Sequence, residues 1–237
     1  LSSWNDGGLK AVDLSRSPSD CDNRFYFLLI ALTILLVGYP YWGRFGGALI
    51  ALGMLVPGIY AVHTNRRIFI GSSILATIVA ATNIVMMIRG ETGNPLVEGA
   101  FFVFYAFITV SLSVEILRTR DYMADTLSGA VSVYLLIGIT FGQLYDLVET
   151  LWPGCFVANL ANGETLGWSQ LLFYSFMTLT TVGYGDITPA IDATRSLAIL
   201  EGTIGVLYVA ILIARLIGSS HNSRETHIGN RSSKIEH

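Results

Sequence analysis

The sequence predicts an all-α membrane protein with six transmembrane helices and a short re-entrant helix between the fifth and the sixth. Hydrophobic residues make up 52% of the 237-residue chain and its mean hydropathy is +0.58. Charged residues make up 13%, well below the usual share of about 25% in soluble domains. Six apolar stretches each approach the roughly 20 residues that cross a bilayer as a helix. A further segment, 168–179, is long enough only for half a crossing.

The six predicted spans follow one another with short connections. They cover residues 25–42, 45–62, 68–88, 96–117, 124–148 and 193–218. The two residues between spans one and two predict an antiparallel hairpin, and Pro40 and Pro57 are expected to bend or end their helices. The connection between spans four and five is also short. We therefore expect the first four spans to pack against spans five and six of their own chain.

Basic residues lie mainly on one side of the predicted spans. They follow spans two, four and six, at Arg66, Arg67, Arg118, Arg120, Arg215 and Arg224. The positive-inside rule then places the tails 1–24 and 219–237 in the cytoplasm, which predicts a multi-pass protein of the plasma membrane. Cys21 and Cys155 fall on opposite sides of the bilayer and cannot pair within one chain. The net charge of −3 gives no reason to expect a nucleic-acid partner.

One motif, between the half-crossing segment and span six, suits the binding of a dehydrated cation. It reads Thr180-Thr181-Val182-Gly183-Tyr184-Gly185-Asp186. Backbone carbonyls can point the same way when residues alternate in hand, and Gly183 and Gly185 accept positive φ at low steric cost. Thr181 adds a hydroxyl oxygen, while Val182 and Tyr184 can point away from the oxygen column. The alternative interpretation is a glycine-rich turn between two spans.

This motif resembles the selectivity filter of the tetrameric potassium channels, in which loops of sequence Thr-Val-Gly-Tyr-Gly replace the hydration shell of K+. The resemblance extends over about 127–218. It implies a filter formed by Thr181, Val182, Gly183, Tyr184 and Gly185, with K+ at Thr181, Val182, Gly183 and Tyr184. Apart from K+ ions, no cofactor is expected.

The resemblance also implies an arrangement of domains. A pore domain covers 124–218, with a turret at 151–167 and a pore helix at 168–179 whose C-terminal end favours a cation. A four-helix domain at 25–118 takes the position of a voltage sensor. Because one chain carries one filter motif, the resemblance implies a homotetramer in the lipid bilayer.

Filter support is expected from Thr180, Asp186, Tyr174, Met177 and Glu201. Many members of the family have tryptophans at the positions of Phe173 and Tyr174 and a glutamate where Met177 stands. Met177 cannot share a proton with Asp186, and of the two aromatic positions only Tyr174 offers a polar group. The hydrogen bonds behind the filter must therefore be rebuilt or fewer.

Glu201 and Gly205 in span six leave alternatives open. Carboxylates inside a membrane are costly and are candidates for function. Glu201 accepts a hydrogen bond from a pore-helix hydroxyl such as Thr178 or Thr180 and braces the filter, or it faces the cavity and concentrates cations, or it lies near the outer interface and reaches Arg195 or water. Gly205 matches the hinge glycine of the family's inner helix; the alternative is close helix packing with Gly202.

The sequence thus predicts a potassium-selective channel that conducts passively and is not an enzyme, since no nucleophile–base arrangement is found. The alternative is a non-conducting or accessory membrane protein that keeps a channel-like fold. Steep voltage gating is not expected. Residues 101–110 of span four contain no basic residue, and the next one is Arg118 at the cytoplasmic end, whereas a voltage sensor needs several charges within the field.

Overall fold

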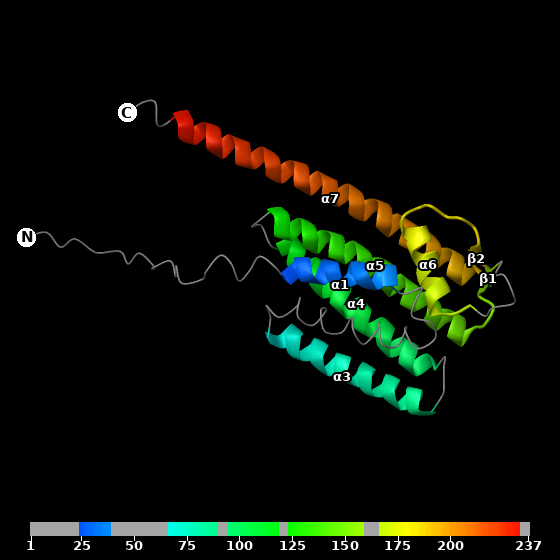
Figure 1. The fold of residues 1–237 in the computed structure, drawn as a ribbon. Helices are drawn as coiled ribbons and strands as arrows, with labels where there is room; N and C mark the ends of the chain where they lie inside the picture. The colour runs from blue at the N-terminus through cyan, green and yellow to red at the C-terminus, as the bar shows by residue number, and fades with distance from the viewer. Residues whose placement is uncertain (1–23, 39–65, 90–93, 119–122, 159–165, 233–237) are drawn as a thin grey trace, which may run out of the picture.

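The computed structural model describes residues 24–38, 66–89, 94–118, 123–158 and 166–232 (Figure 1). Its elements are α1 (Arg24–Gly38), α3 (Arg66–Arg89), α4 (Pro95–Arg118), α5 (Met123–Leu151), β1 (Phe156–Ala158), α6 (Trp168–Leu179), β2 (Ile187–Pro189) and α7 (Asp192–Ser232). Predicted span two at 45–62, with Pro40 and Pro57, lies outside the described residues, as does all but the last residue of the tail 1–24.

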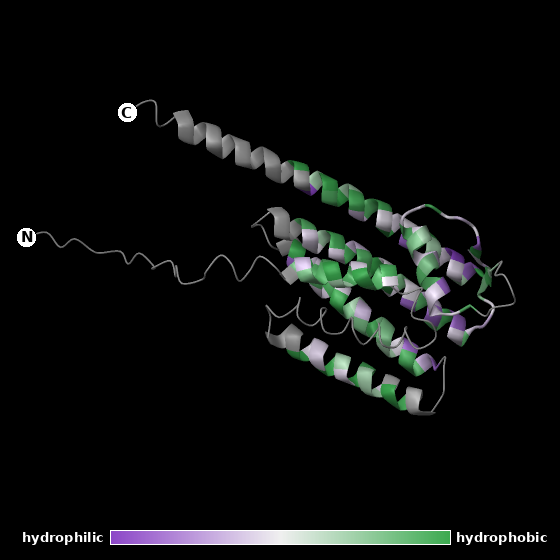
Figure 2. Cartoon of the chain, in the orientation of Figure 1, coloured by the Kyte–Doolittle hydropathy of each residue, from purple (hydrophilic) through white to green (hydrophobic). Residues whose placement is uncertain are grey.

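Three of the described helices are long and apolar enough to cross a membrane. These segments are Pro95–Ile116, Leu127–Leu151 and Asp192–Arg215. Two described helices contain shorter apolar segments, Phe25–Gly38 and Ile70–Thr82, at predicted spans one and three. Apolar residues predominate along the middle of the helices, and polar residues gather at the end that holds β1, β2 and the start of α6 (Figure 2). A membrane protein is therefore supported, while the count of six spans stays a prediction.

The apolar part of the last helix, Asp192–Arg215, lies close to predicted span six, but the helix itself continues beyond that span. Span six was expected to stop at residue 218 and to be followed by a tail at 219–237, but α7 continues to Ser232. The sequence changes from mostly apolar to mostly polar residues near residue 219. A change in hydropathy predicts where a helix leaves the bilayer, but α-helical hydrogen bonds are local and continue through polar sequence. The boundary at 218 is therefore not the end of a helix.

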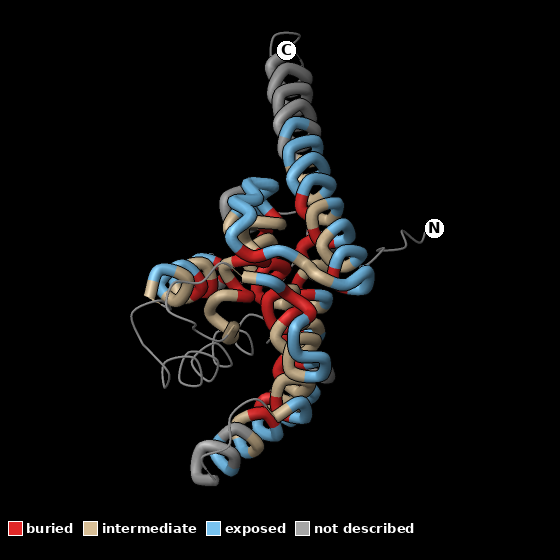
Figure 3. The backbone as a smooth tube through the Cα atoms, turned by 90° about the vertical axis from the view of Figure 1, so that its right-hand side faces the viewer, coloured by how far each residue is buried: buried red, intermediate tan, exposed pale blue. Residues whose placement is uncertain are grey.

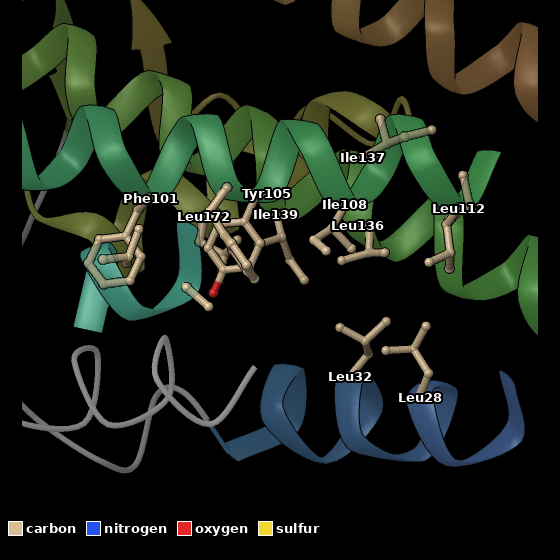
Figure 4. Close-up of a cluster of buried hydrophobic side chains, with 14 of the residues drawn as sticks. Leu28, Leu32, Phe101, Tyr105, Ile108, Leu112, Leu136, Ile137, Ile139 and Leu172 are labelled. Atoms are coloured by element: carbon tan, nitrogen blue, oxygen red, sulfur yellow. The ribbon is translucent and has the colours of Figure 1, made fainter. Parts of the chain in front are cut away.

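Helix α5 lies at the centre of the packing. Helices α1, α4, α6 and α7 all contact it, and α3 packs on the outer side of α4. Leu28 and Leu32 of α1 point toward Leu112 of α4 and Leu136 of α5 (Figure 4). Buried residues concentrate around this centre, and much of α7 is exposed (Figure 3). Within the chain, α1 and α4 thus pack against α5, in agreement with the short connection before it.

Polar side chains also join α4 to α5. The hydroxyl oxygens of Thr109 and Thr140 lie 3.0 Å apart. Closer to the start of α4, Gln143 Nε2 donates to Glu98 Oε2 at 2.6 Å, and Trp168 Nε1 at the start of α6 donates to Gln143 Oε1 at 2.9 Å. Helices in lipid gain little from the hydrophobic effect when they associate, so packing and interhelical hydrogen bonds of this kind hold them together.

A two-stranded antiparallel sheet, which the sequence did not predict, lies beside α5 and α6 at one end of the bundle. Strand β1 pairs with β2 in the register Phe156↔Pro189, Val157↔Thr188 and Ala158↔Ile187. Next to it, Cys155 O accepts hydrogen bonds from Ala190 N at 2.8 Å and Thr194 Oγ1 at 3.2 Å. The predicted all-α class is confirmed for the described helices, with this short sheet as an addition. Strands this short, with partners about thirty residues apart, leave no local periodicity in the sequence.

Cys155 is a free, buried cysteine, and its Sγ donates to Trp152 O at 2.7 Å. Burial, followed by the negative charge of Glu149, raises the pKa of the Cys155 thiol. The thiol is therefore expected to stay protonated and unreactive at neutral pH. Cys21 lies outside the described residues.

The packing of α4 on α5 predicts a difference between two substitutions on α4. Leu112 has no exposed surface, whereas Val110 is 63% exposed. Leu112→Ala should lower the free energy of unfolding by about 2–5 kcal/mol because it leaves a cavity that neighbouring side chains fill only in part. Val110→Ala should change that free energy by less than about 0.5 kcal/mol. Thermal unfolding in detergent measures both; equal losses would contradict this packing.

Candidate functional site

Helix α6 occupies Trp168–Leu179, the residues predicted for the half-crossing helix. At its start, Gly167 N donates to Gln170 Oε1 at 3.2 Å, which satisfies a backbone donor that the helix leaves free. At its end, Thr180 N donates to Phe176 O at 3.0 Å, and Thr180 Oγ1 donates to the same carbonyl at 2.6 Å. The segment 180–186 thus leaves the helix directly, without a flexible linker.

The backbone of this segment alternates between left-handed and right-handed conformations. Positive φ values occur at Thr181 (61°), Gly183 (55°) and Gly185 (79°). The two glycines were expected to adopt them. Thr181 was not, and positive φ is unfavourable for a β-branched residue. Alternation over these residues is what successive carbonyls need in order to point the same way.

Hydrogen bonds from α6 fix this conformation. Thr181 N donates to Thr178 O at 3.0 Å, and Gly183 N donates to Met177 O at 3.1 Å. Met177 therefore supports the segment through its backbone carbonyl rather than its side chain. Strained backbone persists only where its surroundings over-determine it, and these two bonds hold the segment on either side of Val182.

The side chains of the segment are exposed in the single chain. All residues from 180 to 186 are exposed, with Val182 at 50% and Tyr184 at 71%. The ring of Tyr184 stacks on Phe173 at a centroid distance of 6.2 Å. Asp186 accepts a bond from Ile187 N at 3.0 Å, and no hydrogen bond between Asp186 and α6 is found among the described residues. Met177 cannot share a proton with Asp186, and no other described side chain of α6 takes over that role.

Glu201 of α7 lies behind the segment, buried with no exposed surface. Its Oε1 is hydrogen-bonded to Ser175 Oγ of α6, and its Oε2 accepts a bond from Tyr145 OH of α5 at 2.6 Å. Ser175 Oγ also lies 2.7 Å from Gly138 O of α5. The three side chains thus join three helices.

These contacts differ from those expected for Glu201. A hydroxyl of α6 was expected, with Thr178 and Thr180 as examples; a hydroxyl of α6 does contact Glu201, but it is that of Ser175, and Thr180 Oγ1 bonds Phe176 O. The expectation that Glu201 reaches Arg195 is wrong, because Arg195 forms its ion pair with Asp192 at 3.2 Å. The hydroxyl of α6 that contacts Glu201 is that of Ser175, about one turn earlier, because α7 crosses α6 near its end.

Aromatic rings surround this cluster. Tyr145, Phe156 and Tyr174 form a triad in which each pair meets edge to face, at centroid distances of 5.2 to 5.3 Å. Sequence reasoning named Tyr174 but missed Tyr145, Phe156 and Ser175. Only Ser175 carried a usable signal, as a hydroxyl on a half-crossing helix. The other two come from elements whose contact with α6 has no trace in local sequence.

Gly205 marks the point where α7 crosses the end of α6. A Cβ atom at Gly205 would lie 2.4 Å from Leu179 O, whereas one at Gly202 would lie 3.7 Å from Thr178 O. Helix α7 is continuous through both residues. Gly205 therefore packs closely against Leu179 of α6, and not against Gly202 as the sequence suggested. A hinge at Gly205 stays a prediction.

An open hollow of about 470 Å³ separates the segment from α7. Its lining includes Thr181, Gly202 and Thr203, and most of its surface is apolar. Thr181 of the motif thus faces a space bounded by the last helix.

Known proteins resemble this part of the chain. A family model described as "Ion channel" matches residues 130–218. Protein LctB of Bacillus caldotenax is 31% identical over 113 residues, which cover 46% of this chain and 84% of that protein. The chain belongs to this ion-channel family. Membership confirms that the protein is not an enzyme, and the match falls within the predicted pore domain, 124–218.

Two plant relatives of this ion channel match a smaller share of their own length. Two-pore potassium channel 2 of Arabidopsis thaliana is 32% identical over 107 residues, 45% of this chain and 23% of the relative. Two pore potassium channel c of Oryza sativa subsp. japonica is 34% identical over 84 residues, 35% of this chain and 16% of the relative. The chain thus spans less than a quarter of either plant protein. No solved structure is significantly similar to it.

The contrast between Gly205 and Gly202 predicts unequal effects of adding one methyl group. Gly205→Ala should lower the stability of the channel by about 1–3 kcal/mol, as overpacking of a close contact does, because the methyl group meets a backbone carbonyl that cannot rotate away. Gly202→Ala on the same helix should be neutral or slightly stabilising. Thermal unfolding in detergent compares them; unchanged stability in Gly205→Ala would favour the hinge over the packing interpretation.

Proposed function

We propose that this protein is a potassium-selective channel that conducts K+ passively across the plasma membrane. The observation that carries the proposal is the positive φ at Thr181, Gly183 and Gly185. With this alternation, successive carbonyl oxygens of a motif that resembles a potassium filter can point the same way and form a column. The two plant relatives are named potassium channels, which supports K+ as the conducted ion.

The proposed ion sites lie along the motif. Backbone oxygens of Thr181, Val182, Gly183 and Tyr184 replace the hydration shell of K+, and the Thr181 hydroxyl contributes to the innermost site. Gly185 completes the turn at the outer end. Thr180, Asp186, Tyr174, Met177 and Glu201 are the proposed support. The hollow below Thr181 is a suitable place for an ion to enter, next to the C-terminal end of α6, where the helix dipole favours a cation.

The proposed assembly is a homotetramer in the lipid bilayer. One chain offers oxygens from one side of an ion only, and irregular backbone at membrane depth is tolerated only when it is buried in protein or lines water. The exposure of the whole motif, together with that of Ile199 (71%) and Leu200 (51%) on α7, supports a surface that further copies of the chain cover. Both termini are proposed to lie in the cytoplasm.

Ion flux tests the selectivity. Purified protein in liposomes should carry K+ and Rb+ and largely exclude Na+. Tyr184→Asp should reduce the ratio of K+ to Na+ flux, because it removes the ring that stacks on Phe173 and adds a charge beside the filter. Trp152→Asp, which adds the same charge at an exposed turret residue, is the matched control and should keep the ratio. Equal Na+ and K+ fluxes in the wild type would refute selectivity, and no flux at all would favour the non-conducting or accessory alternative.

Voltage dependence should be weak. Moving one elementary charge through the field contributes about 2.3 kcal/mol per 100 mV, and α4 carries no basic residue between its start and Arg118 at its last position. Open probability should therefore change little between strongly negative and strongly positive potentials in planar-bilayer recordings. A steep sigmoid with several effective charges would contradict this expectation.

A further inference from the structure

The hydrogen bonds around Ser175 indicate where one proton lies. Ser175 Oγ has one proton to donate, yet it contacts two acceptors, Gly138 O at 2.7 Å and Glu201 Oε1. A carbonyl oxygen is never a donor, and an ionised carboxylate only accepts. If Glu201 were ionised, one of the two contacts would bring two acceptors together without a proton. If Glu201 is the neutral acid, it donates to Ser175, which donates to Gly138 O.

The second oxygen of Glu201 fits the same assignment. Tyr145 OH donates to Oε2 at 2.6 Å, so Oε2 accepts while Oε1 carries the proton. Glu201 has no exposed surface, and in the described part of the chain it forms no ion pair. A buried carboxylate without a positive partner is costly, and such groups neutralise instead. Every polar atom of the cluster is then satisfied.

The packing around the cluster allows Ser175 to reach the backbone of α5. A Cβ atom at Gly138 would lie 2.7 Å from the ring of Phe176, so a larger residue there would require that ring to move. The carbonyl of Gly138 is thus available to a hydroxyl on the neighbouring helix. The close contact of α6 with α5 at Gly138 and the hydrogen bonds from Glu201 through Ser175 to Gly138 O thus occur at the same place, which we call the junction.

We infer that Glu201 is held as a neutral acid whose proton is donated to Ser175, and that this bond makes Glu201 a positioning residue for the segment 180–186. The junction joins α7 to α6 directly and to α5 through Gly138. Ser175 is two residues before Met177, whose carbonyl holds Gly183 N. A carboxyl on α7 thus fixes the helix that holds the filter, in a chain where the carboxyl position on α6 is taken by Met177.

Infrared spectroscopy tests the protonation of Glu201 directly. The difference spectrum between wild type and Glu201→Gln in lipid at neutral pH should show the loss of a protonated-carboxyl C=O band. Glu98→Gln is the control, because it removes another membrane-embedded carboxyl and should leave the Glu201 band in place. Loss of an ionised-carboxylate band in Glu201→Gln, with no loss of a protonated one, would overturn the inference. This measurement does not depend on ion conduction.

Ion flux tests the positioning role, and this part rests on the proposed function. Ser175→Ala and Glu201→Ala should each lower the ratio of K+ to Na+ flux severalfold. Glu201→Gln should recover most of the wild-type ratio, because its amide N–H can donate to Ser175 while its oxygen accepts from Tyr145. A Glu201→Gln ratio as low as that of Glu201→Ala would show that the charge is needed and would overturn the inference. If Glu201→Ala does not fold, Ser175→Ala still tests the role, because it removes only one oxygen atom. A wild-type ratio of K+ to Na+ flux in Ser175→Ala would also overturn the inference.

Discussion

The hydrogen bonds that meet at Ser175 join the three helices on which the motif depends. Helix α6 ends directly in the segment 180–186, so the position of that segment is set by whatever fixes α6. On one side Ser175 reaches the backbone of α5 at Gly138, and on the other it reaches Glu201 of α7. In an apolar environment an unsatisfied polar group is costly. A shift of any one of these helices would leave several buried polar groups without partners, so the junction permits one arrangement.

The single chain leaves its most specific surface uncovered. The backbone of 180–186 adopts the alternating conformation that an oxygen column requires, including positive φ at Thr181, while its side chains and much of α7 remain exposed. Strain of this kind needs support from several directions. The two backbone bonds to α6 supply it from behind, and in the proposed tetramer neighbouring copies supply it from the sides.

Helix α4 connects to the site by packing and hydrogen bonds. Glu98 of α4 bonds Gln143 of α5, which bonds Trp168 at the first position of α6. A second contact joins Thr109 to Thr140 near the middle of α4 and α5. A displacement of α4 would therefore reach α6 through side chains that are already bonded. These contacts connect α4 through α5 to α6 and the segment 180–186.

The sequence by itself determined the features that depend on neighbouring residues. It predicted the bounds of α6, the approximate bounds of α1, α3, α4 and α5, and positive φ at Gly183 and Gly185, because helix length, hydropathy and glycine flexibility are local properties. It could not give the end of α7, since hydropathy reports the edge of the bilayer and not the end of a helix. Only the tertiary structure decided that Glu201 meets Ser175, that Gly205 meets Leu179, that β1 pairs with β2 and that Thr181 is strained. The first three depend on where two distant segments cross, and crossing is fixed by side-chain packing across the whole bundle rather than by any local sequence pattern. The positive φ of Thr181 depends on the backbone hydrogen bonds that hold the segment 180–186 against the end of α6.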